Sequence, residues 1–155
     1  MNYAKYNLNA NSDLTIFEFL SSGALGDICK VIQFTTTKNP EIINLGFGDK
    51  INVKEDGTFD IDDLNITDNG DRNIVLSTVA NSIYIFTQMY SDKFIFFRGS
   101  CKIRTRLYRM SISMNYLELQ KTFIIFGIVK IDEDKYESTP FDSYSEFIGF
   151  LIKRK

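Results

Sequence analysis

Three segments in the first third of the chain are rich in β-branched and aromatic residues, the pattern of β-strands. They span residues 14–21, 28–36 and 42–49. Two glycines in SSGALGD, between the first two segments, predict a hairpin or a longer loop. Residues 50–70 are polar and full of turn formers, so we expect mainly loop there, with room for a short strand near 52–54.

Residues 72–90 show the clearest helical periodicity in the chain. Val75, Val79 and Ile83 follow the i, i+4, i+8 spacing, which continues to Phe86 or Thr87. Three further residues widen this stripe to a core-facing surface: Leu76, Ala80 and Tyr84. Asn69 or Asp71 is expected to cap the helix, since both precede it and have suitable side chains. A helix with so wide an apolar face should pack on a sheet.

A strand and a second helix follow. Residues 94–98 have no polar interruption before Arg98, which predicts a central strand covered on both faces. Ser100 is the expected cap of a helix that continues to residue 121. Its expected core stripe has the spacing i, i+4, i+7, i+11 and comprises Ile103, Leu107, Met110 and Met114.

The last third predicts two more strands. Residues 123–130 indicate a buried strand, 131–140 a loop, and the apolar run 146–155 a final strand in preference to a helix. The order β-β-β-α-β-α-β-β predicts a single α+β domain over residues 1–155. We expect a mixed, mostly antiparallel sheet with two main helices.

The composition of the chain excludes several kinds of catalytic and metal-binding site. The chain of 155 residues contains no histidine, which excludes Ser-His-Asp and Cys-His catalysis and nearly every usual zinc site. Cys29 and Cys101 lack metal-ligand or redox spacing, and Asp60, Asp62 and Asp63 lack the EF-hand order. We therefore predict no metal and no cofactor. The absence of a membrane-length apolar run and of a secretory h-region predicts a cytoplasmic protein without a membrane partner.

Five basic residues and no acidic one lie between Arg98 and Arg109. With the free amides of a helix N-terminus they indicate a candidate anion site for a phosphate-bearing ligand or an acidic protein surface. Its candidate residues are Ser100, Lys102, Arg104, Arg106, Tyr108 and Arg109. The alternative is an internal salt-bridge network in which Arg104 and Arg106 pair with acidic partners upstream. Those candidate partners are Asp49, Asp68 and Asp71.

Several segments resemble an uncharacterised family of small proteins from Bacteroidetes and relatives, a domain of unknown function. They are NLGFGD, NGDRNIVLSTVANSIYIF, RGS followed by RTRLYRMSIS, and the terminal FLIKRK. The resemblance covers nearly the whole chain and implies a bacterial source. It implies no activity, substrate or catalytic residue.

The order of elements also resembles GNAT-type N-acetyltransferases. Residues 100–108, SCKIRTRLY, look like the last helix of that fold, which implies that Tyr108 is a candidate general acid. The chain departs from those enzymes before its first helix. They carry a glycine-rich pyrophosphate loop there, whereas this chain has Asp68-Asn69-Gly70-Asp71-Arg72, whose carboxylates would repel a pyrophosphate.

Two hypotheses for function follow. The first is a non-catalytic binding module with a basic helix face and a small protein partner or phosphate-bearing ligand, as in a two-gene toxin–antitoxin-like system. The alternative is a GNAT-like transferase acting on a phosphate-bearing or acyl donor ligand. A net charge of −2 does not favour nucleic acid as a partner.

Overall fold

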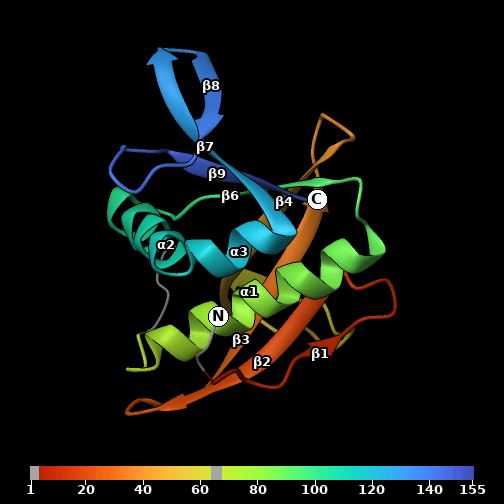
Figure 1. Cartoon of the computed structure of the whole chain (residues 1–155). Coiled ribbons are helices and arrows are strands. Elements are labelled where there is room, and N and C mark those ends of the chain that lie inside the picture. The colour runs from red at the N-terminus through yellow and green to blue at the C-terminus, as the bar shows by residue number, and fades with distance from the viewer. Residues whose placement is uncertain (1–3, 64–67) are drawn as a thin grey trace. The chain divides into compact units, whose positions relative to one another are not determined.

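The computed structural model describes residues 4–63 and 68–155. These residues form an α+β fold with a mostly antiparallel sheet of nine strands and three helices, which confirms the predicted fold class (Figure 1). Along the chain the elements are β1 (Asn9–Ala10), β2 (Ile16–Gly23), β3 (Gly26–Thr36), β4 (Ile42–Ile51), β5 (Asp60–Asp62), α1 (Arg72–Met89), β6 (Phe94–Phe97), α2 (Lys102–Met114), α3 (Tyr116–Thr122), β7 (Phe123–Asp132), β8 (Lys135–Pro140) and β9 (Gly149–Arg154).

The described residues gather into two compact units. Unit 1 contains residues 36–44 and 89–155, and unit 2 contains residues 4–35, 45–63 and 68–88. Strand β4 begins in unit 1 and continues in unit 2. One domain over residues 1–155 stays a prediction.

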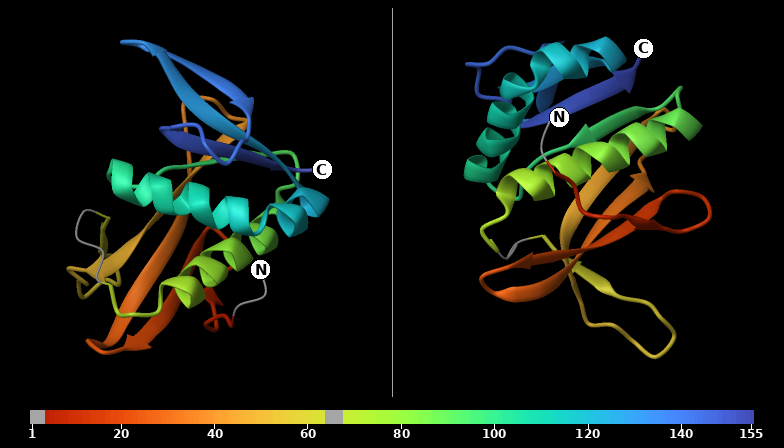
Figure 2. Two further views of the ribbon diagram at one scale, coloured as in Figure 1. Left: turned by 60° about the vertical axis from the view of Figure 1, so that its left-hand side comes forward. Right: turned by 60° about the horizontal axis from the view of Figure 1, so that its bottom comes forward.

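In unit 2, helix α1 packs on one face of the strands (Figure 2). β2 and β3 pair antiparallel up to a tight connection between Gly23 and Gly26. The face they share is aromatic, and Phe34 stacks on Phe86 of α1 with ring centroids 4.2 Å apart. The sequence misplaced one strand of this unit, because residues 52–54 form none and β5 pairs with the end of β4 instead.

The buried face of α1 agrees only in part with the predicted stripe. Ile83, Phe86 and Thr87 are buried as expected, but the five other predicted positions are half-buried. The remaining buried positions carry small hydroxyl side chains, namely Ser77, Thr78 and Ser82. Small side chains let the helix backbone approach the strands closely, which a scan for large apolar residues does not detect.

In unit 1, β6 is a central strand, as predicted. It pairs in parallel with the first residues of β4 and antiparallel with β9, and Ile95 in its middle is fully buried. The predicted final strand is confirmed, since β9 lies between β6 and β7. The predicted loop at 131–140 is wrong. Here β7 and β8 form a hairpin that projects from the strands (Figure 1).

The predicted second helix is two helices separated by Asn115. The backbone of Asn115 leaves helical geometry, with φ −112° and ψ 14°, so α2 ends at Met114 and α3 begins at Tyr116. Ser100 is not the N-cap, because Cys101 occupies that position and makes no side-chain capping bond. Within the described residues, no helix is both long and apolar enough to cross a membrane.

Candidate interaction surface on α2 and α3

The first turn of α2 lies tightly against the end of β6. The Gly99 amide donates a hydrogen bond of 3.1 Å to the Thr105 hydroxyl, which in turn donates to the Cys101 carbonyl. A Cβ atom at Gly99 would lie 2.4 Å from the Thr105 nitrogen, so only glycine fits here. The Ser100 hydroxyl accepts a hydrogen bond from Arg104 one turn later. This contact brings together two of the predicted anion-site residues.

The inward face of α2 is formed by Thr105, Tyr108 and Ile112. Thr105 and Ile112 are buried, and the Tyr108 ring packs edge-on against Phe97 of β6 at 6.0 Å. Burial raises the pKa of the Tyr108 hydroxyl, and the nearby Arg104 charge offsets part of that rise. The Tyr108 ring packs against β6. Its role as a general acid stays a prediction.

Arg109 ties α2 to the loop before β9. Its guanidinium donates a hydrogen bond of 2.8 Å to the Ser145 carbonyl. In the same loop Asp142 accepts hydrogen bonds from the Ser145 amide and hydroxyl. The Ser145 hydroxyl and, more weakly, the Arg109 charge lower the pKa of the Asp142 carboxyl. Arg109 thus belongs to the packed side of the helix, whereas Lys102 and Arg106 are exposed.

The outward face of α2 carries the apolar stripe that the sequence assigned to the core. Ile103 and Met114 are each 73% exposed, and Met110 is 46% exposed. The predicted core stripe is therefore wrong at these three positions. Leu107 between them is half-buried, and Leu117 of α3 continues the stripe with 78% exposure. We call these five residues the outer stripe: Ile103, Leu107, Met110, Met114 and Leu117.

Exposed apolar side chains are ordinary one at a time, but a row of them is not. Four residues of the outer stripe lie on one side of α2 and Leu117 follows in α3, and both helices run along one side of the unit 1 strands in Figure 2. The exposed Arg106 lies beside it, with Lys102 at the first turn. An apolar centre with a charged rim is the composition of a protein-binding surface.

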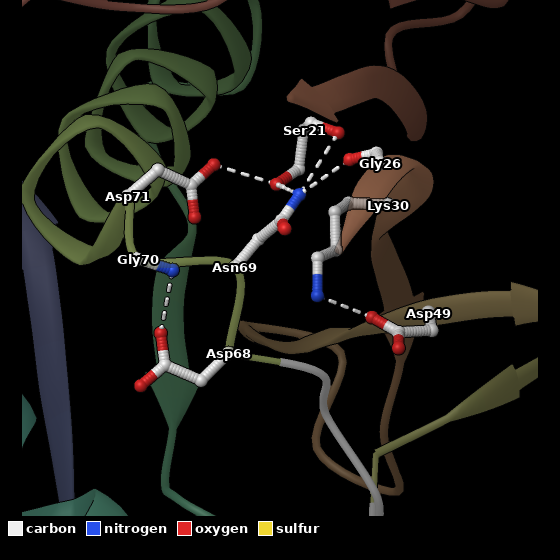
Figure 3. Close-up of polar contacts among 8 residues, drawn as sticks. All are labelled: Ser21, Gly26, Lys30, Asp49, Asp68, Asn69, Gly70 and Asp71. Atoms are coloured by element: carbon white, nitrogen blue, oxygen red, sulfur yellow. Dashed lines mark hydrogen bonds and ion pairs between the residues drawn. The ribbon is translucent and has the colours of Figure 1, made fainter. Parts of the chain in front are cut away.

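The predicted acidic partners lie in a polar cluster of unit 2 (Figure 3). Asp49 forms a buried ion pair with Lys30 of β3. Asp71 accepts hydrogen bonds from the Ser21 hydroxyl at 2.5 Å and from the Tyr6 hydroxyl at 2.6 Å. Their predicted pairing with Arg104 and Arg106 stays a prediction.

Asp68 and Asn69 hold the segment before α1. The Asp68 carboxylate accepts a hydrogen bond of 3.0 Å from the Gly70 amide and lies 3.7 Å from the Arg72 guanidinium. The Asn69 side chain, expected to cap α1, instead donates a hydrogen bond of 2.7 Å to the Gly26 carbonyl (Figure 3). It also accepts a hydrogen bond of 2.7 Å from the Leu25 amide. It therefore anchors the β2–β3 hairpin. Among the described residues, no three Cys, Asp or Glu side chains gather into a candidate metal site.

A model of a family of unknown function (DUF6934) matches residues 2–155. The chain belongs to this family. Neither a curated protein nor a solved structure matches it. The resemblance of this DUF6934 chain to GNAT-type enzymes and its bacterial source stay predictions.

The sequence of this DUF6934 protein predicted a helix with basic and apolar residues at α2. It did not predict which side of that helix packs on the strands. The basic residues were expected as one site, yet Arg109 lies on the packed side and Arg106 on the exposed side. Thr105 was missed as a structural residue, and Asn69 was predicted as a helix cap and not as an anchor of the β2–β3 hairpin. Both roles depend on backbone groups distant in sequence or across a turn. One signal was available: Thr105 and Ile112 are seven residues apart, on the opposite side of the helix from Ile103 and Met110.

Proposed function

We propose that this DUF6934 protein is a non-catalytic protein-binding module and that the outer stripe is its binding surface. One observation carries the proposal. Ile103, Met110 and Met114 are exposed, while the opposite side of α2 uses Thr105, Tyr108 and Ile112 to pack on its own unit. The most apolar side of the helix is thus available to another molecule.

Energetics support a partner for this surface. Burying one large aliphatic side chain contributes about 1.5–3 kcal/mol, so several buried together offset a substantial part of the cost of association. The exposed Lys102 and Arg106 provide a polar rim, which favours an acidic partner and disfavours a basic one. The partner we propose is a small protein, as in a two-gene toxin–antitoxin-like system.

The alternative transferase has less support. In GNAT-type enzymes the segment before the first helix binds pyrophosphate through free backbone amides. Here the Gly70 amide already donates to the Asp68 carboxylate, and the Asp71 carboxylate lies at the start of α1. Two negative charges at this place oppose the binding of a polyphosphate.

Site-specific photocrosslinking in the native host cell tests the proposal. A photoreactive phenylalanine derivative replaces Met114 in the outer stripe or, as a matched control, Ile131, which is 61% exposed in β7. We expect a discrete crosslinked species from position 114 and none from position 131. The captured partner, once purified, should bind the wild-type protein with an affinity that Ile103→Ser with Met114→Ser weakens at least about tenfold, a loss of about 1.4 kcal/mol.

Either of two results would overturn the proposal. One is that position 114 gives no more crosslinking than position 131. The other is that the purified partner binds the double variant as tightly as it binds the wild type.

A further inference from the structure

The outer stripe has the spacing of a coiled-coil seam. Its five residues follow one another at intervals of 4, 3, 4 and 3. In heptad notation the four stripe residues of α2 alternate between d and a: Ile103 and Met110 occupy d positions, and Leu107 and Met114 occupy a positions. Leu117 lies in α3, beyond the break at Asn115. The buried Thr105 and Ile112 fall at f, opposite the seam. This register fits a helix that packs on its own unit with one side and presents a seam on the other.

From this geometry we infer that the outer stripe pairs with an acidic amphipathic helix of a partner protein. The inference rests on the proposed function and names the partner's chemistry. The partner helix lays its own apolar seam along α2. Its acidic residues, at the positions that flank that seam, meet the basic residues of this chain.

The flanking charges support an acidic partner. The exposed Arg106 occupies the g position beside Leu107, and the e and g positions set partner choice in coiled coils. Arg106 is exposed and forms no ion pair with any described residue, so its charge faces solvent. Glu or Asp on the partner would complement this charge and accelerate association.

The width of the stripe favours a helix over a lipid surface. At 3.6 residues per turn, the four stripe residues of α2 lie within about 60° of the helix circumference. Helices that lie on membranes bury a broad apolar face, whereas two-stranded coiled coils use a narrow a/d seam. Pairing with a second copy in parallel register would repeat the same basic residues on both sides of the seam, which is unfavourable.

The test uses two synthetic helical peptides of 21 residues that carry the same leucine seam. One has glutamate at every flanking position, and the other has lysine there. Fluorescence anisotropy measures binding of each peptide to the full-length protein. We expect the glutamate peptide to bind at least about tenfold more tightly in low salt, and the difference to shrink in 1 M salt, where the Debye length is about 3 Å.

Two sets of variants separate this inference from the proposed function. Arg106→Glu should reduce or reverse the preference for the glutamate peptide, while Lys54→Glu, an exposed charge in unit 2, should leave it unchanged. Ile103→Ser with Met114→Ser should weaken binding of both peptides, while the control Ile131→Ser should not.

Equal affinity for the two peptides, or no binding of either, overturns the acidic-helix inference. The proposed function is tested separately, by comparing crosslinking from position 114 with crosslinking from position 131. Two other results also overturn the inference. One is binding to vesicles of phosphatidylglycerol that the double serine variant abolishes. The other is a concentration-dependent dimer of this chain that the same variant dissolves.

Discussion

Helices α1 and α2 both carry apolar residues at helical spacing, but the stripe of α1 faces the strands and the stripe of α2 faces outward. In α1 the stripe faces the strands of unit 2, where Phe86 stacks on Phe34. In α2 the stripe faces outward, and Tyr108 with Ile112 packs on unit 1 instead. Amphipathicity therefore shows that a helix has two faces, but the surface beneath the helix decides which face is buried.

The two buried faces also differ in the size of their side chains. α1 alternates large residues with serine and threonine whose hydroxyls bond mostly to its own backbone carbonyls, as Thr87 does at 2.7 Å from the Ile83 oxygen. α2 uses a half-buried tyrosine ring and a threonine that binds the preceding turn. What the two faces share is an aromatic ring that packs on a strand and at least one buried threonine.

The largest expected effect is at Phe86 in α1. Its side chain is 2% exposed, so Phe86→Ala leaves a cavity against Phe34 and should lower the free energy of unfolding by about 3–5 kcal/mol. Denaturant melts measure the change. A matched control in α2 is Ile103→Ala, which we expect to stay within about 0.5 kcal/mol of wild type. Similar losses at both positions would show that the two stripes are equivalent.

A second comparison lies within α2. Ile112 is 7% exposed, so Ile112→Ala should cost about 2–4 kcal/mol, whereas Met110→Ala should cost less than about 0.5 kcal/mol because its side chain lies outside. Equilibrium unfolding of the two variants, without any partner present, makes the measurement. If Met110→Ala destabilises the protein more than Ile112→Ala, the inward and outward faces of α2 are reversed.

A smaller effect separates two hydroxyls of α1. The Ser77 hydroxyl is buried without a hydrogen-bond partner among the described residues, so Ser77→Ala removes an unsatisfied group and should raise stability by about 1 kcal/mol. The control is Thr78→Val. The Thr78 hydroxyl accepts a hydrogen bond of 2.9 Å from the Tyr6 amide, so its removal should lower the free energy of unfolding by about 1–3 kcal/mol. Thermal melts distinguish a gain from a loss at Ser77.

The smallest expected effect depends on pH and concerns Asp142. Its folded-state pKa is lowered by the Ser145 hydroxyl, so the carboxylate stabilises the fold above its unfolded pKa. This contribution is lost as pH falls through the lowered folded pKa. Asp142→Asn should therefore flatten the acid side of the stability curve and leave α2 in place at neutral pH. Melting temperatures between pH 2 and 7 test this, and an unchanged acid slope would contradict it.

The sequence supported the fold class because strands β2, β3, β4, β6, β7 and β9 have long apolar runs bounded by turn residues. It missed β1, β5 and β8, whose residues are polar and lie mainly in exposed positions, as in the KYESTP segment of β8. Their strand geometry comes from pairing with a neighbour and not from burial. At the candidate site, the basic residues were evident from spacing alone. The orientation of α2 was not, because it depends on tertiary contacts such as the one between Phe97 and Tyr108.

Methionine at two positions of the outer stripe has a consequence for the evolution of a partner. Met110 and Met114 are unbranched, with several rotatable bonds, and such side chains reshape themselves around whatever contacts them. If an amphipathic partner helix binds here as we propose, it can exchange one aliphatic residue for another of different shape without a matching change in this chain. With such a partner, substitutions at its apolar positions would be tolerated. Substitutions of its acidic residues would not, because the planar guanidinium of arginine binds a carboxylate only in a fixed geometry.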